Sequence, residues 1–85
     1  MSENFLNNEK IQRFELDTGE AVAFANYRLE GQTLFIDYVE APPVLRGTGA
    51  AGRLMQHIAD LAQSKGYKMV PICGYAAAWI SRNVK

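Results

Sequence analysis

The sequence predicts an α+β fold with the element order β-β-β-α-β-α. Three runs in which apolar and polar residues alternate come first, and short glycine-containing turns separate them. Alternation of this kind predicts half-buried strands joined as hairpins. A helical repeat and a short apolar run follow, and a helix between two strands favours parallel pairing. We therefore expect a mostly antiparallel sheet with one parallel pair.

The first half of the chain predicts an antiparallel meander. Residues Met1–Glu9 are polar and asparagine-rich and predict a loose end or a late-joining strand. Strands are expected over Ile11–Leu16, Ala21–Leu29 and Thr33–Val39. In the third run the alternation predicts two faces, with Leu34, Ile36 and Tyr38 on one and Phe35, Asp37 and Val39 on the other.

The second half predicts a helix, a strand and a shorter helix. Pro42 and Pro43 end the sheet because proline cannot donate to a strand ladder. The apolar stripe of Ala50–Lys65 has helical spacing, and Gly66 suits the position after a helix. An apolar strand is expected over Tyr67–Cys73, and an alanine-rich helix over Gly74–Arg82. The stripe comprises Ala51, Leu54, Met55, Ile58, Leu61 and Ala62.

Composition limits the classes of function. The 85 residues are 48% hydrophobic and predict one globular domain over 1–85. A formal net charge of zero argues against binding to nucleic acid or to an anionic membrane. One cysteine and one histidine exclude an internal disulfide and a cysteine or multi-histidine metal site. With no signal-like or membrane-length apolar run, we expect a cytoplasmic protein.

The most informative segment is Arg46–Ala51, which lies between a predicted strand and a predicted helix. Gly47 and Gly49 let the backbone turn tightly and bring N–H groups toward one point. The first turn of the helix adds unpaired N–H groups and the positive end of its dipole. The segment predicts a phosphate or pyrophosphate site. The alternative is that the glycines only shape a tight loop.

Two motifs carry a family resemblance. Arg46, Gly49 and Ala51 fit the pattern Arg/Gln-x-x-Gly-x-Gly/Ala, and an apolar run passes through Pro71 into Cys73, then Gly74, an aromatic residue and a helix. Over residues 20–83 the chain resembles the GCN5-related N-acetyltransferases, in particular a minimal single-domain subfamily. The resemblance implies a sheet in which the parallel pair splays apart.

The resemblance also implies the ligand, acetyl-CoA or CoA. Backbone N–H groups of the glycine loop would hold its pyrophosphate, and Arg53 would either add a charge-assisted hydrogen bond or remain a solvated helix charge. The implied cofactor-binding residues are Arg46, Gly47, Thr48, Gly49, Ala50, Ala51 and Arg53.

Three residues are candidates for the chemistry. Cys73 ends the predicted strand and precedes a helix whose N-terminus would lower the pKa of a thiol, so it either accepts the acyl group or lines the pocket. Tyr75 would protonate the departing thiolate, or would pack at the start of the helix. Relatives often carry His-Thr-Glu before the proline segment. Tyr38-Val39-Glu40 stands here instead, which leaves Glu40 or Tyr38 as the base.

These expectations give one main function and two alternatives. The main prediction is an acetyltransferase that moves acetyl from acetyl-CoA to an unknown amine acceptor. The alternatives are an acyl-CoA-binding or sensing protein without turnover, and an interaction protein whose glycine loop is structural. Larger acetyltransferases build the acceptor groove with further elements. The groove here is expected to be open, shared with a protein partner or a second copy, or unused.

Overall fold

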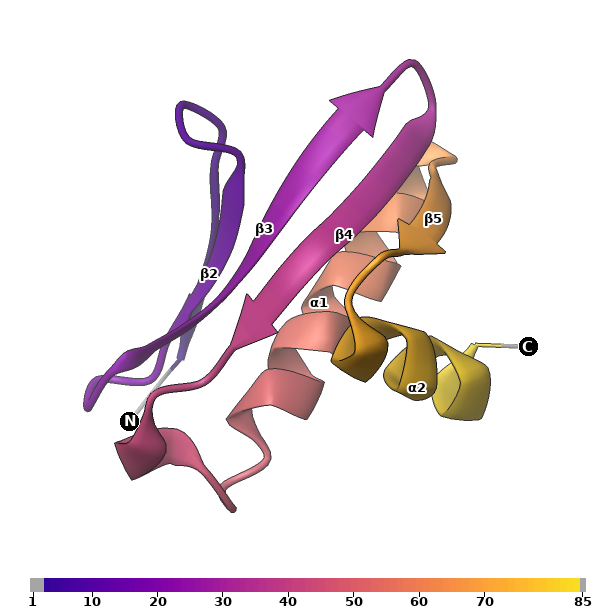
Figure 1. The fold of residues 1–85 in the computed structure, drawn as a ribbon. Coiled ribbons are helices and arrows are strands. Elements are labelled where there is room, and N and C mark those ends of the chain that lie inside the picture. Colours follow the sequence, from indigo (N-terminus) through magenta and orange to yellow (C-terminus); the bar gives the residue numbers. More distant parts are fainter. Residues whose placement is uncertain (1–2, 85) are drawn as a thin grey trace.

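The computed structural model describes residues 3–84 and has two layers, a sheet and the helices packed against it (Figure 1). The sheet has the strand order β1-β2-β3-β4-β5; successive pairs are antiparallel except β4 and β5, which are parallel. The elements are β1 (Asn4–Asn8), β2 (Arg13–Asp17), β3 (Val22–Glu30), β4 (Thr33–Glu40), a 3-10 turn η1 (Pro43–Leu45), α1 (Ala50–Lys65), β5 (Lys68–Pro71) and α2 (Gly74–Asn83).

The predicted fold class is confirmed, with one strand more than expected. The asparagine-rich segment forms β1, which pairs with β2 along its whole length. Met1 and Ser2, which the predicted N-terminal segment included, lie outside the described residues. β2 begins at Arg13 and not at Ile11, because Ile11 lies in the exposed turn between β1 and β2.

Helix α1 has the bounds that its sequence predicts. It begins after Gly49, whose φ is +82°, and ends at Gly66, whose φ is +71°. Both glycines adopt the left-handed conformation, which is costly for a residue with a Cβ. The N–H of Gly66 donates to the carbonyl oxygens of Ala62 and Gln63 and closes the helix. Flanking glycines therefore set both ends of the helix.

The core lies between α1 and one face of the sheet. Alternate residues of β2, β3 and β4 point toward the helix, and the helix presents its apolar stripe to them. Ala50 is buried where the predicted stripe began at Ala51, which is half-buried. The fully enclosed large side chains are Phe14, Leu16, Leu34, Ile36, Leu54, Met55 and Ile58.

A β-bulge in β4 overturns one prediction. Asn26 of β3 pairs with Tyr38, yet the next residue, Tyr27, pairs with Ile36, so Asp37 is an extra residue in β4. Beyond the bulge the alternation is reversed. Tyr38 is 48% exposed and lies off the core, whereas Val39 packs against it. The predicted faces of these two residues were wrong because one extra residue exchanges the faces of all that follow.

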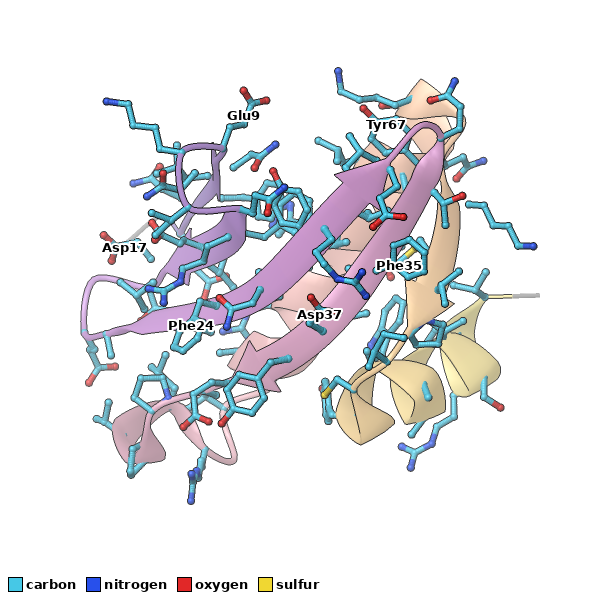
Figure 2. The ribbon with its side chains drawn as sticks, turned by 45° about the horizontal axis from the view of Figure 1, so that its top comes forward. Glu9, Asp17, Phe24, Phe35, Asp37 and Tyr67 are labelled. Atoms are coloured by element: carbon cyan, nitrogen blue, oxygen red, sulfur yellow. The ribbon has the colours of Figure 1, made fainter. Side chains whose placement is uncertain are left out.

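The sheet face away from α1 carries arginine–aromatic contacts. Phe24, Phe35 and Asp37 lie on this face (Figure 2). Arg28 forms two hydrogen bonds with the carboxylate of Asp37, at 2.9 and 3.2 Å, and its guanidinium lies 4.5 Å from the centre of the Phe35 ring. The extra residue of the bulge, Asp37, is therefore bound to Arg28 of β3, and this contact stabilises the bulge.

Candidate functional site

The glycine loop turns the chain sharply between the sheet and α1. Pro42 and η1 lead the chain away from the end of β4, and the loop then passes through Gly47 and Gly49, with φ of +81° and +82°. Two left-handed residues separated by one residue form the kind of backbone concavity in which N–H groups can converge. The local sequence therefore produces the turn that the glycine pattern predicts.

Thr48 is held by its own backbone and side chain. Its N–H donates to the carbonyl oxygen of Leu45 at 3.2 Å, and its hydroxyl donates to the same oxygen. The hydroxyl oxygen accepts a hydrogen bond from the N–H of Ala50 at 3.3 Å. These contacts use donors that would otherwise face solvent, and they fix the loop between two glycines.

Four N–H groups of this segment stay available. Among residues 3–84, no acceptor lies within hydrogen-bonding range of the N–H groups of Gly47, Gly49, Ala51 and Gly52. The last two belong to the first turn of α1, where the helix dipole is positive. A group of free N–H donors at a helix N-terminus binds anions such as phosphate.

Two arginines flank the loop and differ in their engagement. Arg46 is 67% exposed along its side chain; its Nε donates to the carbonyl oxygen of Ala41 at 3.4 Å, and its Nη2 lies 3.9 Å from Glu40 Oε2. Arg53 instead donates to both carboxylate oxygens of Glu3, at 2.9 and 2.6 Å, and to the carbonyl oxygen of Thr48 at 2.7 Å. Arg46 is therefore the arginine with the freer head group.

β4 and β5 part before β4 ends. Their parallel pairing ends at Ile36 and Pro71, and the Ile36 carbonyl oxygen then accepts hydrogen bonds from two consecutive N–H groups, Ile72 at 2.9 Å and Cys73 at 3.1 Å. β5 therefore ends two residues before the predicted Cys73. β4 continues to Glu40 without a partner on its β5 side. The implied splay is present at this point.

Cys73 lies where the chain leaves the splay. It is half-buried against the core and is the residue that caps the N-terminus of α2. Its carbonyl oxygen accepts a hydrogen bond from Ala77 at 2.9 Å, which begins the helix. The predicted position at the start of a helix is thus present, whereas the strand ends two residues earlier than predicted.

Tyr38 and Glu40 form a pair at the same opening. The hydroxyl of Tyr38 donates a hydrogen bond to Glu40 Oε1. This bond, and then the charge of Glu40, raise the pKa of Tyr38, and the charge of Cys73 adds to the shift. The bulge at Asp37 is what brings Tyr38 to the exposed side, so this side chain gains access that the simple alternation did not predict.

Tyr75 extends from α2 to α1. Its hydroxyl lies 3.8 Å from the position that a Cβ on Gly52 would take, and Trp79 Nε1 lies 3.7 Å from the same position. The hydroxyl therefore lies beside the first turn of α1. The predicted residues fall into two groups. One is the loop with Tyr75. The other is Glu40 with Tyr38, close enough to Cys73 for its charge to affect the pKa of Tyr38, and Arg46 Nη2 lies 3.9 Å from Glu40 Oε2.

Comparison with known protein families assigns the chain to one of them. A family model described as GCN5-related N-acetyl-transferase matches residues 13–85, which is most of the chain. The protein belongs to this family. No curated protein matches the chain significantly. The match begins at the first residue of β2, so Glu3 and β1 lie outside it.

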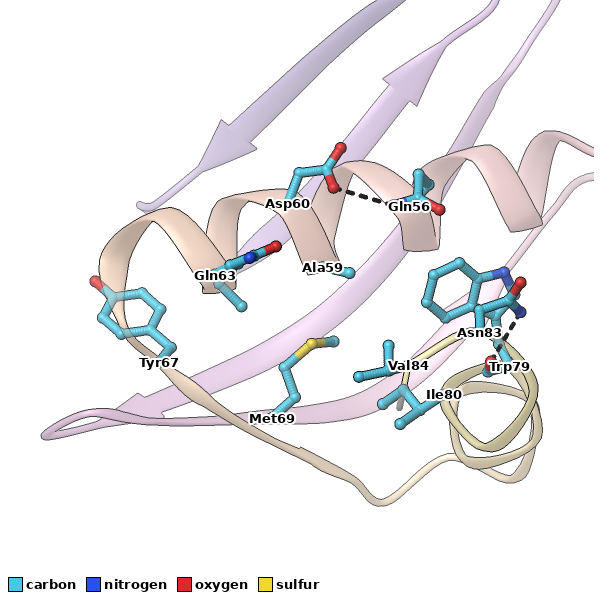
Figure 3. A pocket seen from close by; sticks show the side chains of 11 residues that line it. Gln56, Ala59, Asp60, Gln63, Tyr67, Met69, Trp79, Ile80, Asn83 and Val84 are labelled. Atoms are coloured by element: carbon cyan, nitrogen blue, oxygen red, sulfur yellow. Dashed lines mark hydrogen bonds between the residues drawn. The ribbon is translucent and has the colours of Figure 1, made fainter.

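A hollow of this acetyltransferase-family protein lies elsewhere. It has a volume of about 450 Å³ and lies between the outer side of α1, β5 and the end of α2 (Figure 3). Met69, Trp79 and Ile80 give it an apolar floor, and Asp60 lies on its rim with a hydrogen bond from Gln56. None of the predicted site residues lines it. The candidate site of this family member is therefore distinct from this hollow.

The described chain also contains no helix that is long and apolar enough to cross a membrane. Within residues 3–84, no three side chains of histidine, cysteine, aspartate or glutamate are grouped so that they could hold a metal ion.

Proposed function

We propose that this protein binds acetyl-CoA at the glycine loop and transfers its acetyl group to an amine. The observation that carries the proposal is the set of four free N–H groups, of Gly47, Gly49, Ala51 and Gly52, at the glycine loop and the N-terminus of α1. Family membership supports the same ligand class. The pyrophosphate would lie on the loop and the thioester would enter the splay.

Arg46 is the side chain best suited to support the loop. Its exposed guanidinium has a distant ionic contact with Glu40 and one long hydrogen bond, so donors remain for a phosphate oxygen. The chain has no net charge, so this local pattern of N–H groups and Arg46 would supply the attraction for the anion.

The acetyl transfer would use the second group of residues. Acetyl-CoA, when bound, supplies an activated thioester. Glu40, paired with Tyr38, would take the proton of the attacking amine, and Tyr75 would give a proton to the sulfur that leaves. A free backbone N–H of β4 beyond Ile36 would hold the negative charge that develops on the carbonyl oxygen. The new bond joins nitrogen to the acetyl carbon, and the carbon–sulfur bond breaks.

Cys73 offers a second route. Its sulfur would attack the thioester carbon, the acetyl group would move to Cys73 with release of CoA, and the amine would then take the acetyl group from the cysteine. Its position at the splay supports either this route or a role in lining the thioester end. Both routes give the same product and differ in whether an acetylated protein forms.

Binding without turnover is the second candidate function. Glu40 already accepts a hydrogen bond from Tyr38 and lies 3.9 Å from Arg46, so its carboxylate is engaged by two neighbours before an amine arrives. A carboxylate held in this way suits a sensing protein at least as well as a base. A protein–protein interaction role without CoA is the third candidate.

Ligand-dependent thermal stability tests the cofactor. Acetyl-CoA should raise the melting temperature of the protein, because a ligand that binds only the folded state stabilises it by mass action. Gly49→Asp should abolish the rise by adding a side chain and a negative charge to the loop. Gly31→Asp is the matched control, since Gly31 is also left-handed (φ +60°) but lies in the β3–β4 hairpin. No shift at millimolar acetyl-CoA would exclude the cofactor.

Release of free CoA thiol then separates transfer from binding. The protein would be incubated with acetyl-CoA and a panel of primary amines while free thiol is measured. Amine-dependent release that Glu40→Gln lowers supports transfer. A thermal shift without release supports a sensing role.

A further inference from the structure

Arg53 connects three parts of the chain through one guanidinium. Its Nη1 donates to the carbonyl oxygen of Thr48, and its Nε and Nη2 donate to the two carboxylate oxygens of Glu3, which lies 50 residues away in the sequence. We propose that Arg53 and Glu3 are positioning residues: they orient the peptide between Thr48 and Gly49 so that its N–H faces the anion site. The inference rests on the proposed acetyl-CoA site.

Peptide geometry links the two sides of that bond. The carbonyl of Thr48 and the N–H of Gly49 belong to one planar peptide unit, and none of the described peptides is cis. In a trans peptide these two groups point in opposite directions. A donor that holds the Thr48 oxygen at 2.7 Å therefore directs the Gly49 N–H to the opposite side, away from the guanidinium. This N–H is one of the four that lack a partner.

The missing Cβ of Gly49 favours this contact, and its positive φ favours glycine independently. A Cβ at residue 49 would lie 3.2 Å from Arg53 Nη1, closer than ordinary van der Waals contact. The guanidinium occupies the space that the missing side chain leaves. Arg53 and Gly49 are thus matched, because a Cβ at residue 49 would force the guanidinium to shift by a few tenths of an ångström.

Glu3 holds the other edge of the same guanidinium. Both of its carboxylate oxygens are used, and the hydrogen bonds from Arg53 lower the pKa of Glu3. This arrangement requires an arginine, because the guanidinium donates two parallel hydrogen bonds to the carboxylate and a third to the carbonyl oxygen. The single ammonium group of a lysine cannot form this set of bonds. Glu3 immediately precedes β1 and lies outside the segment that matches the family.

An opposite role for Glu3 makes the proposal testable. If Glu3 only neutralised Arg53 and competed with the phosphate, its removal would free a cation and tighten binding. If Glu3 positions the arginine, its removal loosens the loop and weakens binding. The two roles predict opposite signs for the same substitution.

The experiment compares Glu3→Gln, Arg53→Lys and the double variant with Arg82→Lys as a control on the exposed face of α2. Calorimetry with acetyl-CoA should show weaker binding for each single variant by roughly two- to fivefold, the range for an exposed ion pair. The double variant should be no weaker than Arg53→Lys alone, because Glu3 acts through Arg53. Arg82→Lys should bind as the parent does. Tighter binding by Glu3→Gln would overturn the proposal.

Backbone ¹⁵N relaxation without ligand gives an independent readout. The Gly49 amide should show a lower order parameter in Glu3→Gln and in Arg53→Lys than in the parent, while the Gly66 amide at the other end of α1 stays unchanged. An unchanged Gly49 amide would refute positioning, whether or not acetyl-CoA binds. If the parent binds no acetyl-CoA, the proposed function fails and this measurement alone decides the role of Arg53. If Arg53→Lys does not fold, both the calorimetry and the relaxation measurement are made on Glu3→Gln alone.

Discussion

The N–H of Cys73 donates a hydrogen bond to the carbonyl oxygen of Ile36 at 3.1 Å, at the point where the two parallel strands part. The same oxygen already accepts the N–H of Ile72. One carbonyl therefore ends the strand ladder and fixes the residue that begins α2. The backbone of Cys73 is therefore anchored to β4 at the opening, while its side chain packs against the edge of the core.

This position predicts selective alkylation of Cys73. Iodoacetamide should modify the folded protein at neutral pH, because the side chain is only half-buried at the edge of the splay. Acetyl-CoA should slow the reaction by covering the opening. Mass spectrometry gives a clear answer, since Cys73 is the only cysteine. An acetylated protein mass that Cys73→Ala lacks would favour the covalent route. A thiol that reacts only in denaturant would make Cys73 a core residue.

Arg46→Ala should weaken acetyl-CoA binding without unfolding the protein. Its guanidinium is exposed and makes only long contacts within the described chain, so its removal leaves the fold intact. The loss of a charge-assisted hydrogen bond to phosphate predicts a roughly tenfold to hundredfold weaker affinity by calorimetry. Arg82→Ala removes the same charge at a distance from the loop and should have little effect. Equal affinity in both variants would show that the backbone alone holds the ligand.

Gly52→Ala should stabilise the protein by about 0.5–1 kcal/mol. Gly52 lies inside α1 and its φ is not positive, and an added Cβ would meet Tyr75 and Trp79 at 3.8 and 3.7 Å, which is ordinary contact. Gly47→Ala is the matched comparison. It has open space but a φ of +81°, so it should destabilise by about 1 kcal/mol. Urea denaturation measures both, and a less stable Gly52→Ala would mean that α1 and α2 pack more tightly than described.

Tyr38 should contribute a pH-dependent part of the stability at alkaline pH. Its hydrogen bond to Glu40 raises its pKa above the ordinary value of 10.0, so the folded state holds the phenolic proton more tightly than the unfolded state. This contribution is fully present below pH 10 and is lost as the pH rises through the raised pKa. The stability difference between the parent and Tyr38→Phe, measured in urea from pH 8 upward, should therefore shrink above pH 10. Tyr27, whose pKa burial raises, is present in both proteins and cancels. A constant difference would contradict the prediction.

Local pattern determined much of this protein. The helical period between two glycines indicated the bounds Ala50–Lys65, and the alternation in Ala21–Leu29 indicated the strand that forms β3. The glycine spacing and the Pro71–Cys73 segment together indicated the family. These features are short-range, because a repeat of 3.6 or 2.0 residues and a positive φ are decided by neighbours in the chain.

Tertiary structure decided the rest. The bulge at Asp37 exists only as a mismatch between two paired strands, so the sequence of β4 alone could not show that Tyr38 would leave the core side and Val39 would join it. The same holds for β1, whose polar residues form a strand because their backbone pairs with the edge of β2. Arg53 meets Glu3 across 50 residues because β1 and the start of α1 come together only in the folded chain. Register and long-range pairing depend on which surfaces meet, and a one-dimensional pattern does not contain that information.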